Sequence, residues 1–248
     1  MGLMRLPIVA LALLVTVFAA APDGMAQAAA APCEKRPFDG ASFTVCRFDA
    51  RSDELRLTGQ YRKLADLSKA MGADRDRVRF AMNAGMYDKA GAPIGLYVET
   101  GREKHAINQS GGAGNFHMQP NGVFWKDAAG VHVQATDAYV AGRHKPEWAT
   151  QSGPMLVIGG KLHPSIQDDG PSRYIRNGVG VTDDHTAFFV ISDAPVSFGK
   201  LARLFRDDLK CADALYLDGA VSSLWLPAEG RMDSTFDLGP LIVVVGRK

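Results

Sequence analysis

Asp218 is the one acidic residue in the stretch ALYLDGAVSSLWLP (214–227), where it ends an apolar run that predicts a buried strand. A carboxylate at such a position can cap the turn that follows it. It can equally serve an active site as a nucleophile, a base or an electrostatic stabiliser. Gly219 and Ser222 belong to the loop that follows and are candidates for contacts with a ligand. Both roles of Asp218 are open from this stretch alone.

Four further segments carry glycine and polar residues where a plain apolar strand would otherwise continue. An asparagine inside an apolar run must find hydrogen-bond partners or destabilise the fold, whereas an Asn-Gly pair alone also predicts a simple hairpin turn. The candidate ligand-binding residues of these segments are Asn83 and Gly85 in AMNAGMY, His117, Asn121 and Gly122 in GNFHMQPNGVFW, Ser152 and Gly153 in QSGPMLV, and Arg176 with Asn177 in SRYIRNGV.

Several common catalytic and metal-binding motifs do not occur in the sequence. The glycine-rich loop around Gly111 and Gly114 lacks the Lys-Ser/Thr of a P-loop, and no Gly-x-Ser-x-Gly elbow surrounds a serine. The histidines are scattered singly, and neither a Cys-x-x-Cys pair nor a calcium-loop spacing is present. The sequence therefore predicts neither a metal site nor a cofactor.

Residues 1–28 predict a secretory signal peptide rather than part of the fold. Arg5 precedes an apolar run from about Leu6 to Ala21, and Ala26-Gln27-Ala28 is typical of a cleavage site. The run is short for a membrane span. We expect cleavage after Ala28, with an earlier alanine run or an uncleaved anchor as the alternatives. Residues 29–248 then form a periplasmic or secreted domain with no further membrane span.

Composition limits the partners of this domain. The net charge of the sequence is +1, which gives no broad basic face for nucleic acid. The cysteines suit an oxidising compartment, because a turn could bring Cys33 and Cys46 together in a disulfide. Cys211 is expected to be a buried, unpaired thiol. The sequence predicts no particular oligomeric state.

Hydrophobic periodicity predicts a single α+β domain with a substantial mixed β-sheet core and a few packed helices. Helices are expected over 60–72 and 197–211, the second with Ser197 as its N-cap. The apolar strand 240–246 is expected to be central and covered on both faces. Other strands and hairpins are expected over 42–49, 54–59, 78–87, 94–101, 122–136, 153–164 and 179–193.

The segments taken together, in this order, are more specific than any one of them. The blocks Asn-Ala-Gly-Met-Tyr (83–87), Pro-Asn-Gly-Val-Phe (120–124), Ser-Gly-Pro (152–154) and Leu-Asp-Gly (217–219) resemble the phosphodiester glycosidase family, over roughly residues 43–246. That family includes the lysosomal uncovering enzyme and many secreted bacterial proteins associated with exopolysaccharide. The chain is more similar to the bacterial branch, because Ala220 and Val221 stand where many members carry glycine.

The resemblance implies one pocket formed by Asn83, Asn121, Arg176 and Asp218 and lined by Ser152-Gly153-Pro154. Cleavage of a sugar-phosphodiester bond passes through an oxocarbenium-like transition state that a carboxylate can stabilise. Asp218 would supply that carboxylate, and Arg176 would hold the phosphate, since a guanidinium suits bidentate phosphate contact.

Two further residues have both a catalytic and an ordinary interpretation. Asp193 in VISDAPVSF is the candidate second catalytic carboxylate, although a cap or turn before the helix at Ser197 explains it equally well. His117 is a candidate proton carrier, although a lone histidine in a loop is more often incidental.

The sequence thus predicts a secreted or periplasmic glycosidase that hydrolyses a sugar-phosphodiester linkage of envelope or exopolysaccharide glycans, with a carbohydrate or sugar phosphate as substrate. The alternative is a non-catalytic envelope glycan-binding protein that uses the same pocket, because Ala220 and Val221 restrict the loop after Asp218. A metal-dependent phosphodiesterase is a third, weaker interpretation.

Overall fold

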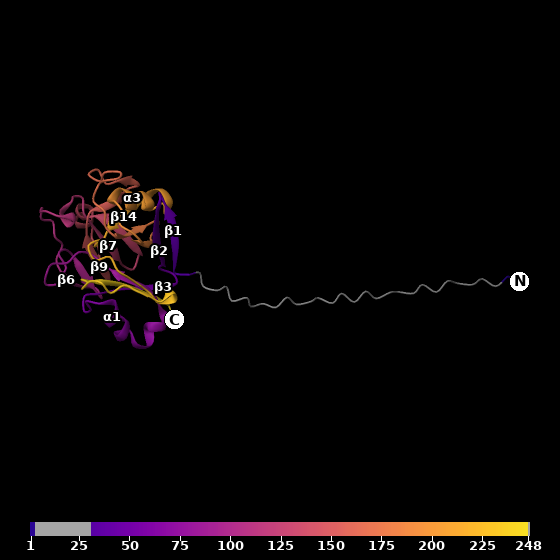
Figure 1. The fold of residues 1–248 in the computed structure, drawn as a ribbon. Coiled ribbons are helices and arrows are strands. Elements are labelled where there is room, and N and C mark those ends of the chain that lie inside the picture. Colours follow the sequence, from indigo (N-terminus) through magenta and orange to yellow (C-terminus); the bar gives the residue numbers. More distant parts are fainter. Residues whose placement is uncertain (3–30, 248) are drawn as a thin grey trace. The chain divides into compact units, whose positions relative to one another are not determined.

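The computed structural model describes residues 1–2 and 31–247, and residues 31–248 form one compact unit. The predicted signal peptide and its cleavage site lie outside the described residues, apart from the first two. Figure 1 shows a domain built mainly of strands, with α1 and α3 on opposite sides of it.

Three antiparallel sheets contain the strands. In order across each sheet, the first is β1 (Cys33–Phe38), β2 (Ala41–Asp49), β13 (Thr186–Ser192), β12 (Asn177–Val181), β14 (Asp213–Tyr216), β10 (Met155–Ile158) and β11 (Lys161–Leu162). The second is β16 (Arg231–Met232), β15 (Leu224–Leu226), β4 (Val78–Asn83), β17 (Leu241–Gly246) and β3 (Asp53–Thr58). The third is β6 (Arg102–His105), β5 (Tyr97–Glu99), β9 (Trp148–Ser152), β7 (Gly122–Lys126) and β8 (Val131–Ala135).

The strand pairing differs from the mixed sheet that the sequence predicted, while the α+β class with few helices is confirmed. Every ladder between the described strands is antiparallel. Short turns join several consecutive strands, and a tight turn permits only antiparallel pairing. In two of these hairpins an aspartate fixes the turn: Asp127 Oδ1 accepts from Ala129 N at 2.9 Å, and Asp183 Oδ1 accepts from Thr186 N at 2.7 Å.

Both predicted helices are present but shorter than expected. The first is α1 (Leu64–Ala70), which continues as the 3-10 helix η1 (Gly72–Arg77). The second is α3 (Phe198–Arg203), whose N-cap Ser197 accepts from Lys200 N at 3.1 Å, followed by the π-helical turn η3 (Leu204–Asp208). The remaining helical segments are η2 (Asn115–His117), α2 (Thr136–Ala141) and η4 (Pro227–Glu229). Among the described residues, no helix has the length and apolar character needed to span a membrane.

Each sheet has one face on a shared core and one face covered by a helix. Side chains of α3 pack with β2, β13 and β14, those of α1 pack with β4 and β17, and Tyr139 of α2 packs with β7. β17 illustrates the arrangement, since Ile242 and Val244 enter the shared core while Val243 and Val245 face α1. The prediction of a central strand covered on both faces is confirmed, because β17 pairs with both β4 and β3.

Three phenylalanines mark the point where the sheets meet. Phe80 of β4, Phe124 of β7 and Phe189 of β13 are fully buried and come from different sheets. The Phe189 ring centroid lies 5.5 Å from that of Phe80 and 5.5 Å from that of Phe124, with the second pair edge to face. Such aromatic pairs contribute beyond the area they bury.

The cysteines lie as the sequence predicted. Cys33 and Cys46 are opposite each other on β1 and β2 and form a disulfide. Cys211 is buried and unpaired, and burial raises the pKa of its thiol to about 12.

Phe189→Ala is expected to lower the free energy of unfolding by about 3–5 kcal/mol, because it opens a cavity where the three sheets meet. Denaturant unfolding measures the change. Phe236→Ala is the matched control, since Phe236 is 44% exposed, and it should change stability by less than about 0.5 kcal/mol. Equal stability of the two variants would show that the three-phenylalanine contact does not hold the sheets together.

Candidate functional site

Asn83, the last residue of β4, connects three of the polar segments. Its Nδ2 donates to the carbonyl of Asp218 at 3.0 Å, and its Oδ1 accepts from Ser223 N at 2.9 Å and from Asn177 Nδ2 at 3.1 Å. The side chain is 1% exposed. The amide of Asn83 is therefore satisfied within the protein, and it fixes the backbone on both sides of the 219–222 loop.

Asn177 and Ser222 extend the same network. Asn177 Nδ2 also reaches the carbonyl of Asn83 at 3.0 Å, and the Ser222 hydroxyl lies 3.0 Å from the carbonyl of Ile175 and 3.2 Å from Asn177 Oδ1. We call Asn83, Asn177, Asp218, Ser222 and Ser223 the asparagine cluster. It joins the end of β4, the start of β12 and the segment after β14, which are far apart in the sequence.

The carboxylate of Asp218 is half-buried, and few protein groups replace the hydration that it loses. Its Oδ1 accepts from Ala220 N at 3.1 Å, and no Lys or Arg among the described residues pairs with it. Burial raises the pKa of Asp218, and the hydrogen bond from Ala220 offsets only part of that rise. A desolvated carboxylate with a raised pKa, beside a loop, is typical of an acid-base or nucleophilic group.

Arg176 does not lie where a phosphate could touch it. The side chain is fully buried, and its guanidinium donates to the carbonyl of Val196 at 2.9 Å, to the Tyr216 hydroxyl at 3.0 Å and to Ser172. The ring of Phe198 lies 3.6 Å from its central carbon. Burial lowers the pKa of Arg176. The structure therefore does not support direct phosphate contact, because four of the five donors already have partners inside the fold.

Tyr216 joins Arg176 to the loop and was not predicted from the sequence. A Cβ added to Gly219 would lie 1.8 Å from the Tyr216 hydroxyl, so only glycine permits this approach. Burial raises the pKa of Tyr216 to about 12, against the opposing charge of Arg176. The signal that could have found it is the two-residue strand period, since Tyr216 precedes Asp218 by two positions.

Tyr87 is a second residue that the sequence interpretation missed. Burial raises the pKa of its phenol, and the nearby negative charge of Asp218 raises it further. Its hydroxyl donates to the carbonyl of Asp237. Tyr87 ends the Asn-Ala-Gly-Met-Tyr block, so its place in that block was the available signal.

Asn121 belongs to a different network from Asp218. It is fully buried, donates from Nδ2 to the carbonyl of Phe116 at 2.9 Å, and accepts from Thr136 Oγ1 at 2.7 Å. Gln151 Nε2 donates to the same hydroxyl of Thr136 at 3.1 Å. The expectation that Asn121 faces the Asp218 pocket is not met, since its amide anchors the glycine-rich loop to the third sheet.

Close backbone approaches explain the glycines and Ser152. A Cβ on Gly85 would lie 2.4 Å from the carbonyl oxygen of Gln151, and Gly122 and Gly153 likewise pack against Met155 and the Asn121 side chain. The Ser152 hydroxyl donates to the carbonyl of Leu217 at 3.0 Å. Ser152 thus ties the segment that leads to Asp218 to the end of β9, and the three glycines allow close packing against their neighbours.

Asp193 is bound in a separate ionic cluster. It accepts from Ser42 Oγ at 2.7 Å, Lys35 Nζ at 2.8 Å and Thr44 Oγ1 at 3.0 Å. Burial opposes ionisation of Asp193, but these hydrogen bonds outweigh it and lower the pKa. Among the described residues, no member of the asparagine cluster binds the Asp193 carboxylate, and the N-cap of α3 is Ser197. Asp193 lies in a bend before α3, as the turn interpretation has it, and these contacts do not bring its carboxylate to Asp218.

His117 stabilises the glycine-rich loop. Its Nδ1 lies 2.9 Å from the carbonyl of Ser110, its ring meets Phe116 edge to face, and Gly112 packs closely against it. These contacts match the incidental-loop interpretation better than that of a proton carrier.

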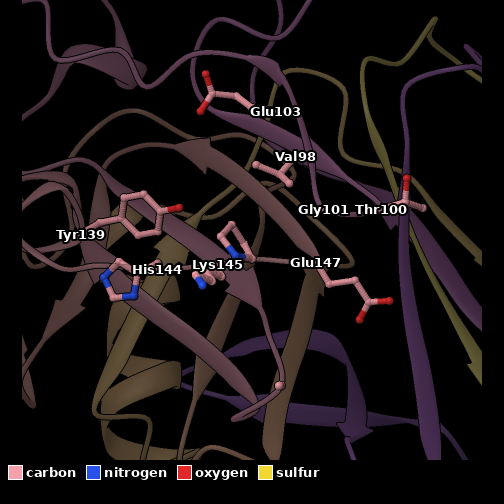
Figure 2. Close-up of a pocket in the computed structure, with 10 residues that line it drawn as sticks. Val98, Thr100, Gly101, Glu103, Tyr139, His144, Lys145 and Glu147 are labelled. Carbon is pink, nitrogen blue, oxygen red and sulfur yellow. The ribbon is translucent and has the colours of Figure 1, made fainter.

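Two cavities bear on where a ligand could bind. A cavity of about 210 Å³ lies beside Asn115, Ser172 and Phe198, so it adjoins the partners of Arg176. The larger cavity in Figure 2, about 770 Å³, lies instead beside Tyr139 and Glu147. Over the part of the chain that the structure describes, no group of three or more His, Cys, Asp or Glu side chains is placed to hold a metal.

Tyr216→Phe is expected to cost about 1–3 kcal/mol in the free energy of unfolding, because it leaves a buried N–H of Arg176 without its acceptor. Chemical denaturation measures it. Tyr61→Phe, on the half-buried tyrosine that packs near α1, is the matched control and should have almost no effect. A Tyr216→Phe variant as stable as the parent protein would rule out the Arg176–Tyr216 contact as a structural link.

A family model described as phosphodiester glycosidase matches residues 76–237. The uncharacterized protein YigE of Escherichia coli (strain K12) is 37% identical over 163 residues, which are 66% of this chain and 62% of YigE, so the match spans less than two thirds of that relative.

Solved structures show the same fold at low sequence identity. The catalytic domain of zebrafish N-acetylglucosamine-1-phosphodiester alpha-N-acetylglucosaminidase, auto-inhibited by its pro-peptide, has a TM-score of 0.60 at 14% identity, covering 87% of this chain and 82% of that one. A hypothetical protein from Synechocystis has a TM-score of 0.54 at 14% identity, covering 87% and 61%. Since the family model covers more than half of the sequence, the chain belongs to the phosphodiester glycosidase family.

Proposed function

We propose that this protein hydrolyses a sugar-phosphodiester linkage in envelope or exopolysaccharide glycans, with Asp218 as the catalytic carboxylate. Membership of the family supports a glycosidase-type function in general. The single observation that carries the proposal is the half-buried, unneutralised carboxylate of Asp218, whose segment is joined to the blocks of Asn83 and Ser152.

The chemistry of the bond fits one carboxylate better than two. In its ionised form Asp218 would stabilise or attack the anomeric carbon as positive charge develops there. The leaving group is a phosphate monoester, which is weakly basic and needs less protonation than a sugar hydroxyl. No second acidic side chain hydrogen-bonds to Asp218 in the described part of the chain, and this chemistry does not require one.

Arg176 takes a positioning role in this proposal. Its guanidinium holds Tyr216, whose hydroxyl sets the path of the backbone at Gly219, next to Asp218. No salt bridge to Arg176 is found among the described residues, so its buried charge also adds positive potential behind the loop. Such a field favours an anionic phosphate without requiring contact.

The proposed location is the periplasm or the cell exterior. The predicted signal peptide and the Cys33–Cys46 disulfide both support an oxidising compartment.

A non-catalytic glycan-binding protein remains the second candidate, on one observation. Asp218 already accepts a backbone hydrogen bond from Ala220, as a turn-capping aspartate would, and Asp193 is engaged by Lys35. A binding protein would keep this geometry without turnover.

Asp218→Asn is expected to reduce release of sugar from a sugar-1-phosphodiester panel by at least ~100-fold, because the amide cannot supply the negative charge or act as a base. Product-resolved chromatography of the reaction measures it. Asp193→Asn is the matched control and should retain the parent rate within about threefold, since it lies in a different cluster. No sugar release by the parent protein on any member of the panel would favour the binding protein.

On the acid side of its pH profile, kcat/KM should fall at a higher pH than it would for an aspartate of ordinary pKa. Burial raises the pKa of Asp218 in the free protein, so the active carboxylate forms only at higher pH, and activity falls as pH drops through that raised value. The measurement is a pH profile at subsaturating substrate. An acid limb in the usual aspartate range would contradict the assignment of Asp218 as the ionised group.

A further inference from the structure

The cavity in Figure 2 has none of the residues of the asparagine cluster in its lining. Its volume is about 770 Å³, within the range of ligand sites. Four segments line it: the β5–β6 hairpin with Thr100 in its turn and Glu103 in β6, the turn between β7 and β8 with Ala128, the helix α2 with Tyr139, and the 144–147 segment that leads into β9.

A stacked aromatic group fixes one wall of this cavity. The ring of Tyr139 stacks on His144 with centroids 4.6 Å apart and planes inclined by 19°, and Trp125 contacts both rings at 5.0 and 4.6 Å. Trp125 is 2% exposed and donates from Nε1 to Asp127 at 3.1 Å. Tyr139 is therefore held in place before any ligand arrives, which lowers the entropic cost of binding.

The polar groups of the cavity include both donors and acceptors. Glu103 and Glu147 offer carboxylate oxygens, Lys145 offers an ammonium group and Tyr139 a hydroxyl. The charge of Glu103 contributes to the raised pKa of Tyr139, after burial, so the two groups lie near each other. Glu147 also binds Lys126 at 2.5 Å, which holds its side chain in place.

This set of groups selects among ligand classes. Lys126 pairs with Glu147, and Lys145 opposes the charge of Glu103, so the cavity offers no net positive charge that would favour an anion such as a phosphate ester. An apolar ligand would strip water from three charged side chains without replacing their hydrogen bonds. A neutral polyhydroxylated ligand satisfies donors and acceptors together, and its C–H face can pack on the apolar surfaces of Tyr139, Val98 and Pro146.

We propose that this cavity is a second glycan-binding site, which takes a neutral oligosaccharide segment and is separate from the site at Asp218. The two sites lie at opposite ends of β9. Glu147 precedes β9 and lines the cavity, whereas Ser152 ends it and bonds the strand of Asp218. The five residues of β9 span about 16 Å between the two sites. A polymeric glycan could be retained at one site while it is processed at the other.

The test is isothermal titration calorimetry of the full chain with two neutral tetrasaccharides, chitotetraose and cellotetraose. At least one should bind, and Tyr139→Ala should weaken that binding at least tenfold. Glu103→Gln, on an exposed side chain that cannot disturb the core, should weaken it about threefold or more. Asp66→Asn, on an exposed aspartate of α1, and Asp218→Asn should leave the affinity unchanged.

Three outcomes would overturn the proposal. The first is that neither tetrasaccharide binds. The second is that Asp218→Asn abolishes binding while Tyr139→Ala retains it. The third is that spermidine binds and the tetrasaccharides do not, which would indicate a cation site. Thermal melting checks that Tyr139→Ala is folded. If it is not, Tyr139→Phe and Glu103→Gln decide the question, with weakened binding by both expected. The result does not depend on whether Asp218 hydrolyses a phosphodiester, because binding and turnover are measured separately.

Discussion

The contact of Phe189 with Phe80 and Phe124 is the constraint on which the rest of the structure depends. One side chain from each sheet fills the space where the three sheets converge, so the sheets share a core. Each sheet then has an outer apolar face that water would otherwise reach, and α3, α1 and α2 cover these faces in turn. Moving any one sheet would disturb both the shared core and its covering helix.

This convergence also builds the candidate site. The ends of β4, β12, β14 and β9 meet at one edge, and the hydrogen bonds of Asn83, Asn177 and Ser152 tie them together there. All of these bonds have a backbone carbonyl as their acceptor, whereas the carboxylate of Asp218 accepts a single hydrogen bond from the described residues, donated by Ala220 N. The site thus consists of a rigid network of polar side chains beside the carboxylate of Asp218, whose negative charge has no basic partner among the described residues. Asp213, at the other end of β14, shares a burial-driven rise in pKa but lacks that frame.

Sequence patterns predicted best those features that depend on residues close together in the chain. The hairpins over 122–136 and 179–193, the N-cap at Ser197 and the central position of β17 follow from turn chemistry, capping and hydrophobic period. Two expectations depended on distant packing and failed. Pairing was antiparallel rather than mixed, and Asn121 joined Thr136 instead of Asp218. No local pattern distinguishes these outcomes, because each is set by residues far away in the chain.

The sequence by itself determined the strand-rich α+β class, the two main helices, the cysteine pair and the membership of Asp218 and Asn83 in one set of motifs. Only the tertiary structure decided which polar side chains stay open to a ligand. Arg176 and Asp193 are charged residues in polar segments. The guanidinium of Arg176 is buried against the ring of Phe198, and the carboxylate of Asp193 is paired with Lys35. Exposure and ion pairing depend on which surfaces the fold brings together, and a residue's type does not carry that information.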